Sequence, residues 1–290
     1  MNDRAGWAFE MGQEIVPGRV ALKKLGGGKR YEVYLAWDER LRSQVVVKLV
    51  RPDQVDDPRS IRDLERELQA LDRLAHPMLV HLLGALVEGE RPHLVLEHLE
   101  GPTLRALIKS GGPLQMDRLV PLAIEAGEAL RHISAKAMVH LDVKPSNIVM
   151  QSPPKLIDLS LTRSVEVAAS IKRPVGTRKY MSPEQCVPTR LGPVGPPADV
   201  WGLGATLYEA AAGRRAFDTP ARGKVPDEAP DSVKYPQLVL DPPPLPASVP
   251  PTVAELIRSC LEREPEARPG AGDVTVRLRP LLGGQRHGGR

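Results

Sequence analysis

One short segment near the middle of the chain carries the residues best suited to chemistry. Asp142, Lys144 and Asn147 stand at positions n, n+2 and n+5 of a loop that leaves a long predicted helix. A carboxylate can accept the proton of a hydroxyl group, and a lysine can neutralise a phosphoryl group that is being transferred. An amide oxygen can bind Mg²⁺, a hard cation that prefers oxygen ligands. The segment therefore predicts phosphoryl transfer assisted by a metal ion.

A second carboxylate follows at a spacing that completes a metal site. Asp158 comes sixteen residues after Asp142 (158 − 142) and ends a predicted strand, Lys155-Leu156-Ile157. Together with the Asn147 amide it predicts a site for a metal ion and a triphosphate. A chance arrangement of loop residues is the alternative, and the ordered occurrence of all these residue types makes it the weaker one.

A lysine and a glutamate nearer the N-terminus could form an ion pair. Lys48 stands inside the apolar run 45–50, where an ammonium group is costly to bury unless it meets an anion. Glu67 lies nineteen residues later (67 − 48), in the middle of a predicted helix, and could supply that anion. A lysine on the exposed face of a strand is the alternative.

Three consecutive glycines precede this lysine in the chain. Gly26, Gly27 and Gly28 lie between two predicted strands, and without side chains they let backbone amides approach a phosphate closely. A tight hairpin would use the same residues. A Rossmann-type dinucleotide site is excluded because a strand, not a helix, follows the glycines.

The elements that must position these residues change in character along the chain. Short runs of β-branched and aromatic residues predict strands up to residue 98, and apolar residues at helical spacing predict helices beyond it. This order indicates an α+β fold. We expect strands at Val20–Leu25, Glu32–Trp37 and Gln44–Val50, a helix from an N-cap at Ser60 to Leu74, strands at Leu82–Glu88 and His93–Glu97, and helices at Thr103–Ser110, Met116–Ala137, Ala198–Ala212, Thr252–Leu261 and Gly270–Leu282.

Two proline-rich stretches interrupt the helical part, at Val187–Pro197 and Pro220–Pro251. The second contains ten prolines in 32 residues, which forbids a long helix there. We expect it to be a surface loop packed on the helices, and a ligand for a proline-binding partner domain is the alternative.

Composition excludes several classes of protein. The chain has 290 residues, 41% of them hydrophobic, and its 55 glycines and prolines (25 + 30) are too few for a collagen-like or disordered chain. The net charge of +4 comes without a stripe of basic and aromatic residues, so nucleic acid is not an expected partner. Cys186 and Cys260 lack metal-ligand spacing. Because no apolar stretch suits a membrane span or a signal peptide, a soluble cytoplasmic protein is expected.

With these motifs in order, the sequence resembles the eukaryotic-type Ser/Thr protein kinases, in particular the bacterial members, over residues 16 to 282. The segment from Leu25 to Tyr34 looks like their glycine-rich ATP loop, G-x-G-x-x-G-x-V, with Tyr31 in place of the third glycine. The resemblance implies that Lys48 pairs with Glu67 and that Leu96 is the gatekeeper residue. It implies an ATP site formed by Leu25, Gly26, Gly27, Gly28, Val33, Lys48, Leu96, Glu97, Leu99, Asn147 and Asp158.

The segment at Asp142 is similar to the catalytic loop of that family, H-R-D-x-K-P-x-N. By this resemblance Asp142 is the base, and Lys144 is the partner of the γ-phosphate. Asn147 and Asp158 would be the metal ligands. Thr177 lies in a stretch that looks like the substrate-side loop, and its hydroxyl would brace Asp142 and Lys144.

Two further matches lie in the helical part. Residues 199–204 look like the start of a central helix of the family, and Arg268 matches the arginine that pairs with the glutamate of A-P-E, here Glu184. Lys144, placed two residues after the base, is typical of the Ser/Thr branch of the family.

The resemblance implies a bilobal protein kinase-like fold, with a five-stranded antiparallel N-lobe containing one helix and a mainly α-helical C-lobe. The kinase domain would span 16–282, with the N-lobe at about 18–98, the C-lobe at about 99–282, and flexible tails at 1–15 and 283–290. The implied activity is that of a non-specific serine/threonine protein kinase. It would use ATP with Mg²⁺ or Mn²⁺ and act on proteins, including itself. Whether the chain forms a homodimer is left open.

Three departures from the family pattern support an alternative, a pseudokinase that binds ATP as a signalling scaffold. Tyr31 replaces a glycine, Leu141 replaces the arginine before the catalytic Asp142, and Leu159 and Ser160 replace the last two residues of D-F-G. Because an arginine at 141 would hold a phosphorylated activation loop, we expect that this chain does not need such phosphorylation. A small-molecule phosphotransferase is disfavoured because its relatives lack the substrate-side loop seen here.

Overall fold

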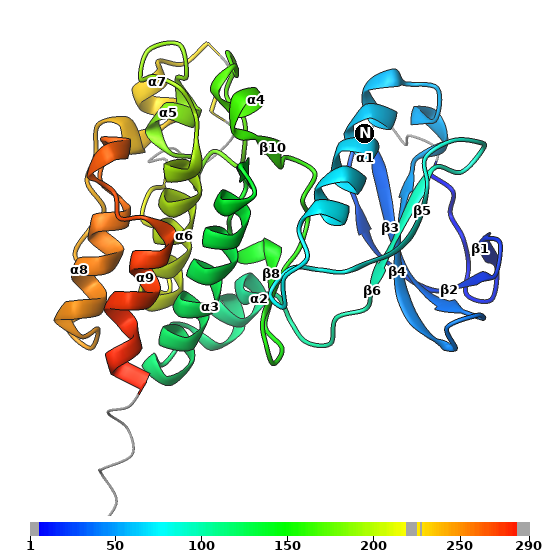
Figure 1. Ribbon diagram of the computed structural model, residues 1–290, viewed down its shortest axis with the longest axis horizontal. Helices are drawn as coiled ribbons and strands as arrows, with labels where there is room; N and C mark the ends of the chain where they lie inside the picture. The colour runs from blue at the N-terminus through cyan, green and yellow to red at the C-terminus, as the bar shows by residue number, and fades with distance from the viewer. Residues whose placement is uncertain (1–5, 219–224, 227, 283–290) are drawn as a thin grey trace, which may run out of the picture. The chain divides into compact units, whose positions relative to one another are not determined.

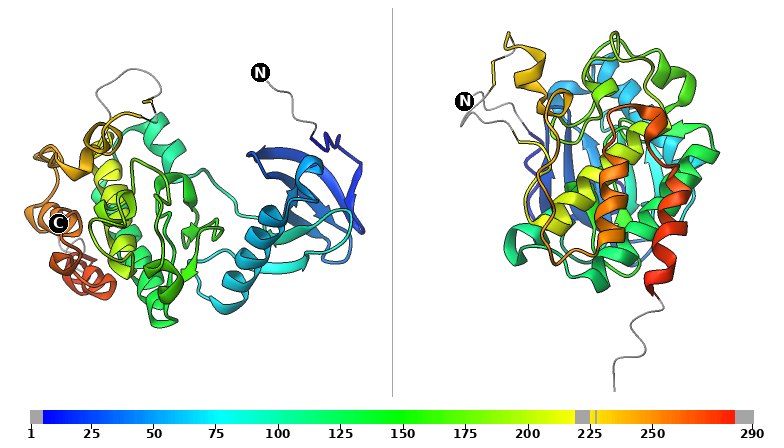
Figure 2. Two further views of the ribbon diagram at one scale, coloured as in Figure 1. Left: turned by 90° about the horizontal axis from the view of Figure 1, so that it is seen from above. Right: turned by 90° about the vertical axis from the view of Figure 1, so that its left-hand side faces the viewer.

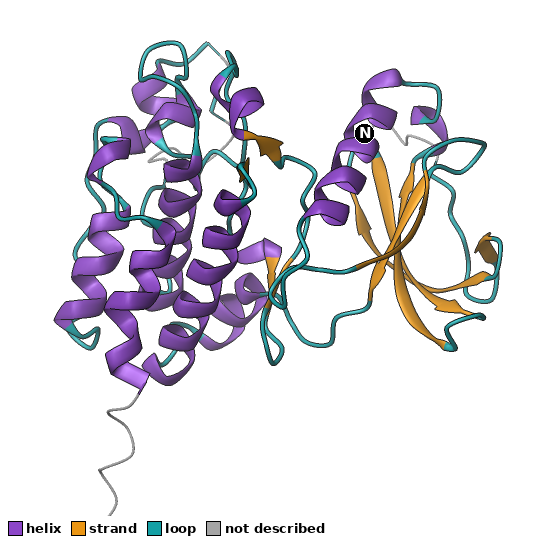
Figure 3. Ribbon diagram, viewed as in Figure 1, coloured by secondary structure: helices purple, strands orange, loops and turns teal. Residues whose placement is uncertain are grey.

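The computed structural model describes residues 6–218, 225–226 and 228–282. Strands dominate one unit of the chain and helices dominate the other, as Figure 1 and Figure 3 show. The expected α+β class, with a sheet-rich part followed by a helical part, is confirmed. Unit 1 comprises Met1–Ala75, Leu79–Glu100 and Asp158–Ser160, and unit 2 comprises His76–Met78, Gly101–Ile157 and Leu161–Arg290.

Unit 1 is built on an antiparallel sheet that has six strands among the described residues, in the order β1-β2-β3-β4-β6-β5. Strand β3 alternates buried and more exposed residues, as expected when one face of a sheet lies on a core. Its register places Val33 opposite both Gly26 and Lys48. The strands are β1 (Glu14–Val16), β2 (Arg19–Gly27), β3 (Tyr31–Asp38), β4 (Ser43–Val50), β5 (Leu82–Leu86) and β6 (His93–Glu97).

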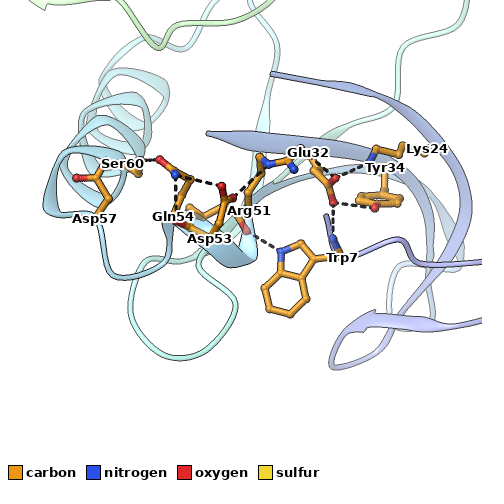
Figure 4. Close-up of polar contacts among 10 residues, drawn as sticks. Trp7, Lys24, Glu32, Tyr34, Arg51, Asp53, Gln54, Asp57 and Ser60 are labelled. Carbon is orange, nitrogen blue, oxygen red and sulfur yellow. Dashed lines mark hydrogen bonds and ion pairs between the residues drawn. The ribbon is translucent and has the colours of Figure 1, made fainter. Parts of the chain in front are cut away.

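The N-terminal segment differs from the expected five strands and flexible tail over 1–15. Strand β1 has only three residues, too few to show a strand pattern, and is ordered by pairing with β2. Trp7 donates its backbone N–H to Glu32 (3.0 Å), as Figure 4 shows, and its indole N–H to the Val50 carbonyl (2.7 Å). Its ring stacks on Phe9, with 5.9 Å between the ring centroids. The prediction of a tail is therefore wrong for residues 6–15, because tertiary packing of aromatic rings orders them.

Helix α1 (Pro58–Arg73) starts before the predicted cap at Ser60. Asp57 is the N-cap, and its carboxylate accepts the N–H of Arg59 (3.1 Å). Proline follows at the first helical position, where its fixed φ suits a helix and its missing N–H is not needed. Ser60 is buried in the first turn and donates its hydroxyl to Asp57 (3.0 Å). A single 3₁₀ turn, η1 (Pro52–Gln54), precedes the helix.

Unit 2 is organised around helix α6 (Pro196–Ala212), which is apolar around most of its circumference and therefore buried on nearly all sides. Helix α6 packs against α3 and α8, and α9 packs against the same two helices, as Figure 2 shows. Among the described residues, no helix is both long and apolar enough to cross a membrane. The expected helices are present as α2 (Leu104–Gly111), α3 (Met116–Ala135), α6, α8 (Pro251–Cys260) and α9 (Ala271–Leu278), the last followed by η5 (Arg279–Leu282).

Short elements of unit 2 frame its loops. Among the described residues of this unit, β7 pairs with β10 and β8 pairs with β9, each pair antiparallel. The short strands are β7 (Met138–Val139), β8 (Ile148–Val149), β9 (Lys155–Leu156) and β10 (Arg163–Ser164), and the short helices are η2 (Pro145–Asn147), α4 (Val165–Ala169), α5 (Pro183–Cys186) and η4 (Pro265–Ala267).

The proline-rich stretch 220–251 is a packed loop in its described part. Residues 220–224 and 227 of this stretch lie outside the described residues. The others include the short helix α7 (Asp231–Lys234) and the turn η3 (Pro236–Leu238), and the α8 helix begins only at the last proline. Tyr208 of α6 donates its hydroxyl to the carbonyl of Pro243 (2.8 Å), which ties the loop to the central helix.

Both cysteines are buried thiols in unit 2. Cys186 is 1% exposed and Cys260 is fully buried, and neither forms a disulfide. Burial raises the pKa of Cys260 to about 12 and also raises the pKa of Cys186. Since the thiolate is the reactive form, neither thiol should react with a disulfide reagent at pH 8 until denaturant is added. Rapid native reaction of either thiol, followed by absorbance, would contradict this prediction.

Candidate active site

A buried carboxylate of α6 anchors the loop that carries Asp142. Asp199, in the first turn of α6, accepts the backbone N–H groups of His140 and Leu141, each at 2.7 Å. Burial raises the pKa of Asp199 to about 7, although these two hydrogen bonds act in the opposite direction. The ring of His140 is buried, and its Nδ1 accepts the N–H of Asp142 (3.2 Å). The loop backbone is therefore fixed on both sides of Leu141.

Leu141 has a backbone φ of 70°, a conformation that is strained for leucine. Its side chain lies in an apolar cluster with Ala168 of α4 and Ala198 of α6. Partly buried Val165 of α4 packs against the same cluster. The leucine that replaces the family's arginine thus contacts the segment after β10 through apolar packing.

The carboxylate of Asp142 is held by groups of Lys144, Asn147 and Thr177 in unit 2. Its Oδ1 accepts the backbone N–H of Thr177 (3.0 Å) and the hydroxyl of the same residue (2.7 Å). Its Oδ2 accepts the ammonium of Lys144 (2.5 Å), which also donates to the Thr177 hydroxyl (2.8 Å). Asn147 donates its side-chain amide to the Asp142 carbonyl (3.0 Å) and to Oδ2 of the carboxylate (3.3 Å). The structure therefore brings together the four predicted residues of this unit.

Unit 1 contains a second charged group, formed by Lys48, Glu67 and Asp158. The ammonium of Lys48 lies 2.6 Å from Glu67 Oε2 and 3.2 Å from Asp158 Oδ1. Burial acts to lower the pKa of Lys48, but the two carboxylates outweigh it and the pKa is raised. Lys48 is therefore a charged residue in an apolar strand with anionic partners, and the predicted contact with Glu67 is present.

The backbone of the Asp158-Leu159-Ser160 segment accommodates the leucine and serine that replace the family's phenylalanine and glycine. Asp158 has a positive φ of 65°, while Leu159 is fully buried and so packs inward as a phenylalanine would. Ser160 has no positive φ, so the freedom of a glycine is not required at this position.

The remaining predicted ATP-binding residues all belong to unit 1. Gly26 and Gly27 end strand β2, and Gly28 lies in the turn before β3. Val33 lies on β3 opposite Lys48, and Leu96 lies on β6 opposite Val46 of β4. The N–H of Glu97 donates to the carbonyl of His81 (3.0 Å). Leu25 at the end of β2 is half exposed, and Leu99 follows β6 with partial burial.

A buried ion pair supports the segment 176–184. Arg268 donates through both terminal nitrogens to Glu184, at 2.7 and 2.8 Å, as the resemblance implies. The same guanidinium donates to the carbonyls of Pro197 (3.0 Å) and Glu262 (2.8 Å) and lies 5.1 Å from the ring centroid of Trp201. One arginine thereby joins this segment to α6 and to the loop after α8.

Two glutamines that sequence reasoning missed also hold this segment. Gln185 of α5 donates its amide to the carbonyls of Leu141 and Val175, each at 2.9 Å. Gln237, in the proline-rich stretch, donates to the carbonyls of Arg178 (2.7 Å) and Met181 (3.0 Å). The spacing of Ser182 and Gln185 is a local signal, because it is that of a helix capping box, which Gln185 forms. No such signal marks Gln237, because its partners are backbone carbonyls, which every residue has.

Comparisons with known proteins agree with this geometry. A family model described as the protein kinase domain matches residues 19–277. The probable serine/threonine-protein kinase PkwA of Thermomonospora curvata is 32% identical over 269 residues, which cover 90% of this chain and 34% of that protein. PknB of Mycobacterium leprae is 33% identical (68% and 33% covered), and PknA of Mycobacterium tuberculosis is 32% identical (88% and 59% covered). The chain thus spans about one third to three fifths of the length of these relatives.

Proposed function

The chain belongs to the protein kinase family, and on this premise we propose that it transfers the γ-phosphoryl group of ATP to serine or threonine hydroxyls of proteins. The observation that carries the proposal is the carboxylate of Asp142, held by both hydrogen-bonding groups of Thr177 and by Lys144. The names of the three relatives, all serine/threonine-protein kinases, support the choice of substrate hydroxyl.

In the proposed reaction, Asp142 orients the substrate hydroxyl and accepts its proton. The hydroxyl oxygen forms a bond to the γ-phosphorus as the bond to the bridging oxygen of ADP breaks. Thr177 binds Oδ1 of Asp142, so the carboxylate is held in position before the substrate binds. Lys144 places a positive charge beside the acceptor, where it offsets the charge of the phosphoryl group. The protein therefore acts by positioning and charge.

Lys48 is proposed to bind the α- and β-phosphates, with Glu67 holding its ammonium in place. Asp158 and Asn147 are the proposed metal ligands, because each carries a side-chain oxygen of the kind that a divalent ion such as Mg²⁺ binds. When bound, that ion would neutralise the triphosphate. The side-chain amide nitrogen of Asn147 donates to Asp142, so the side-chain amide oxygen of Asn147 is the proposed ligand for the ion. We propose Mg²⁺, with Mn²⁺ as a substitute.

The direct test is transfer of radiolabelled phosphate from ATP. The purified chain is incubated with Mg²⁺ or Mn²⁺ and a generic basic protein, and labelling of that protein and of the chain itself is measured. Transfer that needs the divalent ion and labels serine or threonine supports the proposal. Bound ATP without transfer would contradict it and favour the scaffold alternative.

The activation segment supplies a further prediction about this reaction. Ser164 caps α4 by accepting the N–H of Val167 (3.4 Å), and Ser170 donates to the carbonyl of the same residue (2.8 Å). Because Leu141 has no guanidinium to hold a phosphate, the double variant Ser164→Ala/Ser170→Ala should keep the initial transfer rate of the wild type. Phosphatase-treated wild type is the matched control. A collapse of the rate in the variant, or after phosphatase treatment, would refute this prediction.

A further inference from the structure

Tyr31 occupies the place at which the family's loop has its third glycine, and it contacts two elements of unit 1. Its hydroxyl donates to the carbonyl of Ser60 in the first turn of α1 (2.8 Å). The ammonium of Lys48 lies 5.1 Å from the centroid of its ring, within the range of a cation–π contact. A glycine at this position could make neither contact.

Both contacts of Tyr31 lead to the same face of α1. Ser60 and Glu67 are seven residues apart (67 − 60), about two helical turns, so they share one side of the helix. Glu67 binds Lys48, and Ser60 binds Tyr31, which lies beneath that ammonium. The first turn, the lysine and the start of β3 therefore form one closed set of contacts.

The neighbouring residues strengthen this connection. Arg30, in the turn before β3, forms an ion pair with Asp63 of α1, one turn after Ser60. Ser60 itself is buried, and its hydroxyl contacts Asp57 and Gln54, as Figure 4 shows. Burial raises the pKa of Tyr31, so its hydroxyl stays protonated and able to donate.

We propose that Tyr31 is a positioning residue for Lys48. It fastens the end of the glycine-rich turn to α1 and covers the ammonium, so that the pair of Lys48 and Glu67 is assembled before nucleotide binds. The consequence for ATP rests on the proposed function. The contact with α1 is independent of it.

The structural consequence is tested by hydrogen exchange of α1 in the full chain. Tyr31→Phe keeps the ring and removes the donor, and exchange over 58–67 should become about two- to tenfold faster than in wild type. Tyr31→Gly also removes the ring and should act more strongly. The matched control is Tyr34→Phe, which deletes a buried hydroxyl bound to Glu32 (2.9 Å) from the other face of β3 and should leave α1 exchange unchanged.

A kinetic measurement then separates positioning from general destabilisation. If Tyr31 keeps α1 and Lys48 assembled, Tyr31→Phe should raise the KM for ATP in inverse proportion to the fraction of the chain that stays assembled, and leave kcat at saturating ATP unchanged. If the substitution only destabilised the fold, a smaller fraction of the protein would be active, and kcat would fall instead. The KM for ATP of Tyr34→Phe should equal that of wild type.

Three results would overturn the proposal. They are wild-type exchange of α1 in Tyr31→Phe, equal acceleration in Tyr34→Phe, or a fall in kcat without a change in KM. Hydrogen exchange does not require turnover. If the wild-type chain fails to transfer phosphate, the proposed function is refuted, but the exchange experiment still tests the contact between Tyr31 and α1.

Discussion

Replacing Asp142 by asparagine is expected to lower the rate of phosphoryl transfer by about 10²–10⁴-fold. The amide has the size of the carboxylate, and its oxygen can still accept from Thr177. It cannot take the proton of a substrate hydroxyl at neutral pH, and its NH₂ group would face the ammonium of Lys144 in place of an anion. Single-turnover transfer from radiolabelled ATP measures the effect.

The control for this variant is a change of the same chemistry away from the site. Asp117 is exposed in the first turn of α3, so Asp117→Asn should retain the wild-type rate. Binding of a fluorescent nucleotide should be equal in both variants, because Asp142 is proposed to act on the hydroxyl and not on ATP. If Asp142→Asn retained the full rate, Asp142 would not be the base in this reaction.

The largest effect on stability is expected at Arg268. Its side chain is 0% exposed and that of Glu184 is 1% exposed, so Arg268→Met would leave an unpaired buried carboxylate and remove a donor from backbone carbonyls. Breaking one partner of a buried pair typically lowers the free energy of unfolding by about 3–5 kcal/mol. That is a large share of the total for a folded domain. Urea unfolding followed by tryptophan fluorescence measures it, with Trp201 beside the guanidinium.

An exposed ion pair of equal length provides the comparison. Arg131 and Glu128 of α3 are also 2.7 Å apart, but their side chains are 58% and 31% exposed, and Arg131→Met should change stability by about 1 kcal/mol or less. The double variant Glu184→Leu/Arg268→Met should recover part of the loss because no buried charge remains. Equal losses in Arg268→Met and Arg131→Met would show that burial is not the source of the effect.

The sequence by itself determined the elements that depend on neighbours along the chain and the contacts between residues of family motifs. Periodicity located the central strands of unit 1 and the main helices of unit 2, because side-chain spacing reflects which face is buried. Family motifs indicated the partner of Lys48 and that of Arg268, and both contacts are present. These motifs are readable because charged residues seldom fall in this order and at this spacing by chance.

Only the tertiary structure decided the features that rest on distant partners outside these motifs. Strand β1 and the packing of Trp7 exist because β2 and Glu32 lie beside them, and three residues of strand have no pattern of their own. The sequence predicts Ser60 as the N-cap of α1, whereas Asp57 caps the helix in the structure; serine and aspartate both cap helices well, so residue type does not locate the start.

The same reason accounts for the residues around the candidate site that the sequence did not reveal. Gln237 acts through carbonyl groups that lie more than fifty residues away in the chain, and Tyr31 acts through a carbonyl of α1. Every residue has such a carbonyl, so a sequence cannot tell which of them a side chain will meet. From the sequence alone, Tyr31 is recognised only as a residue that stands where the family pattern has a glycine. The fold makes it a contact between the glycine-rich turn and helix α1, whose Glu67 binds Lys48.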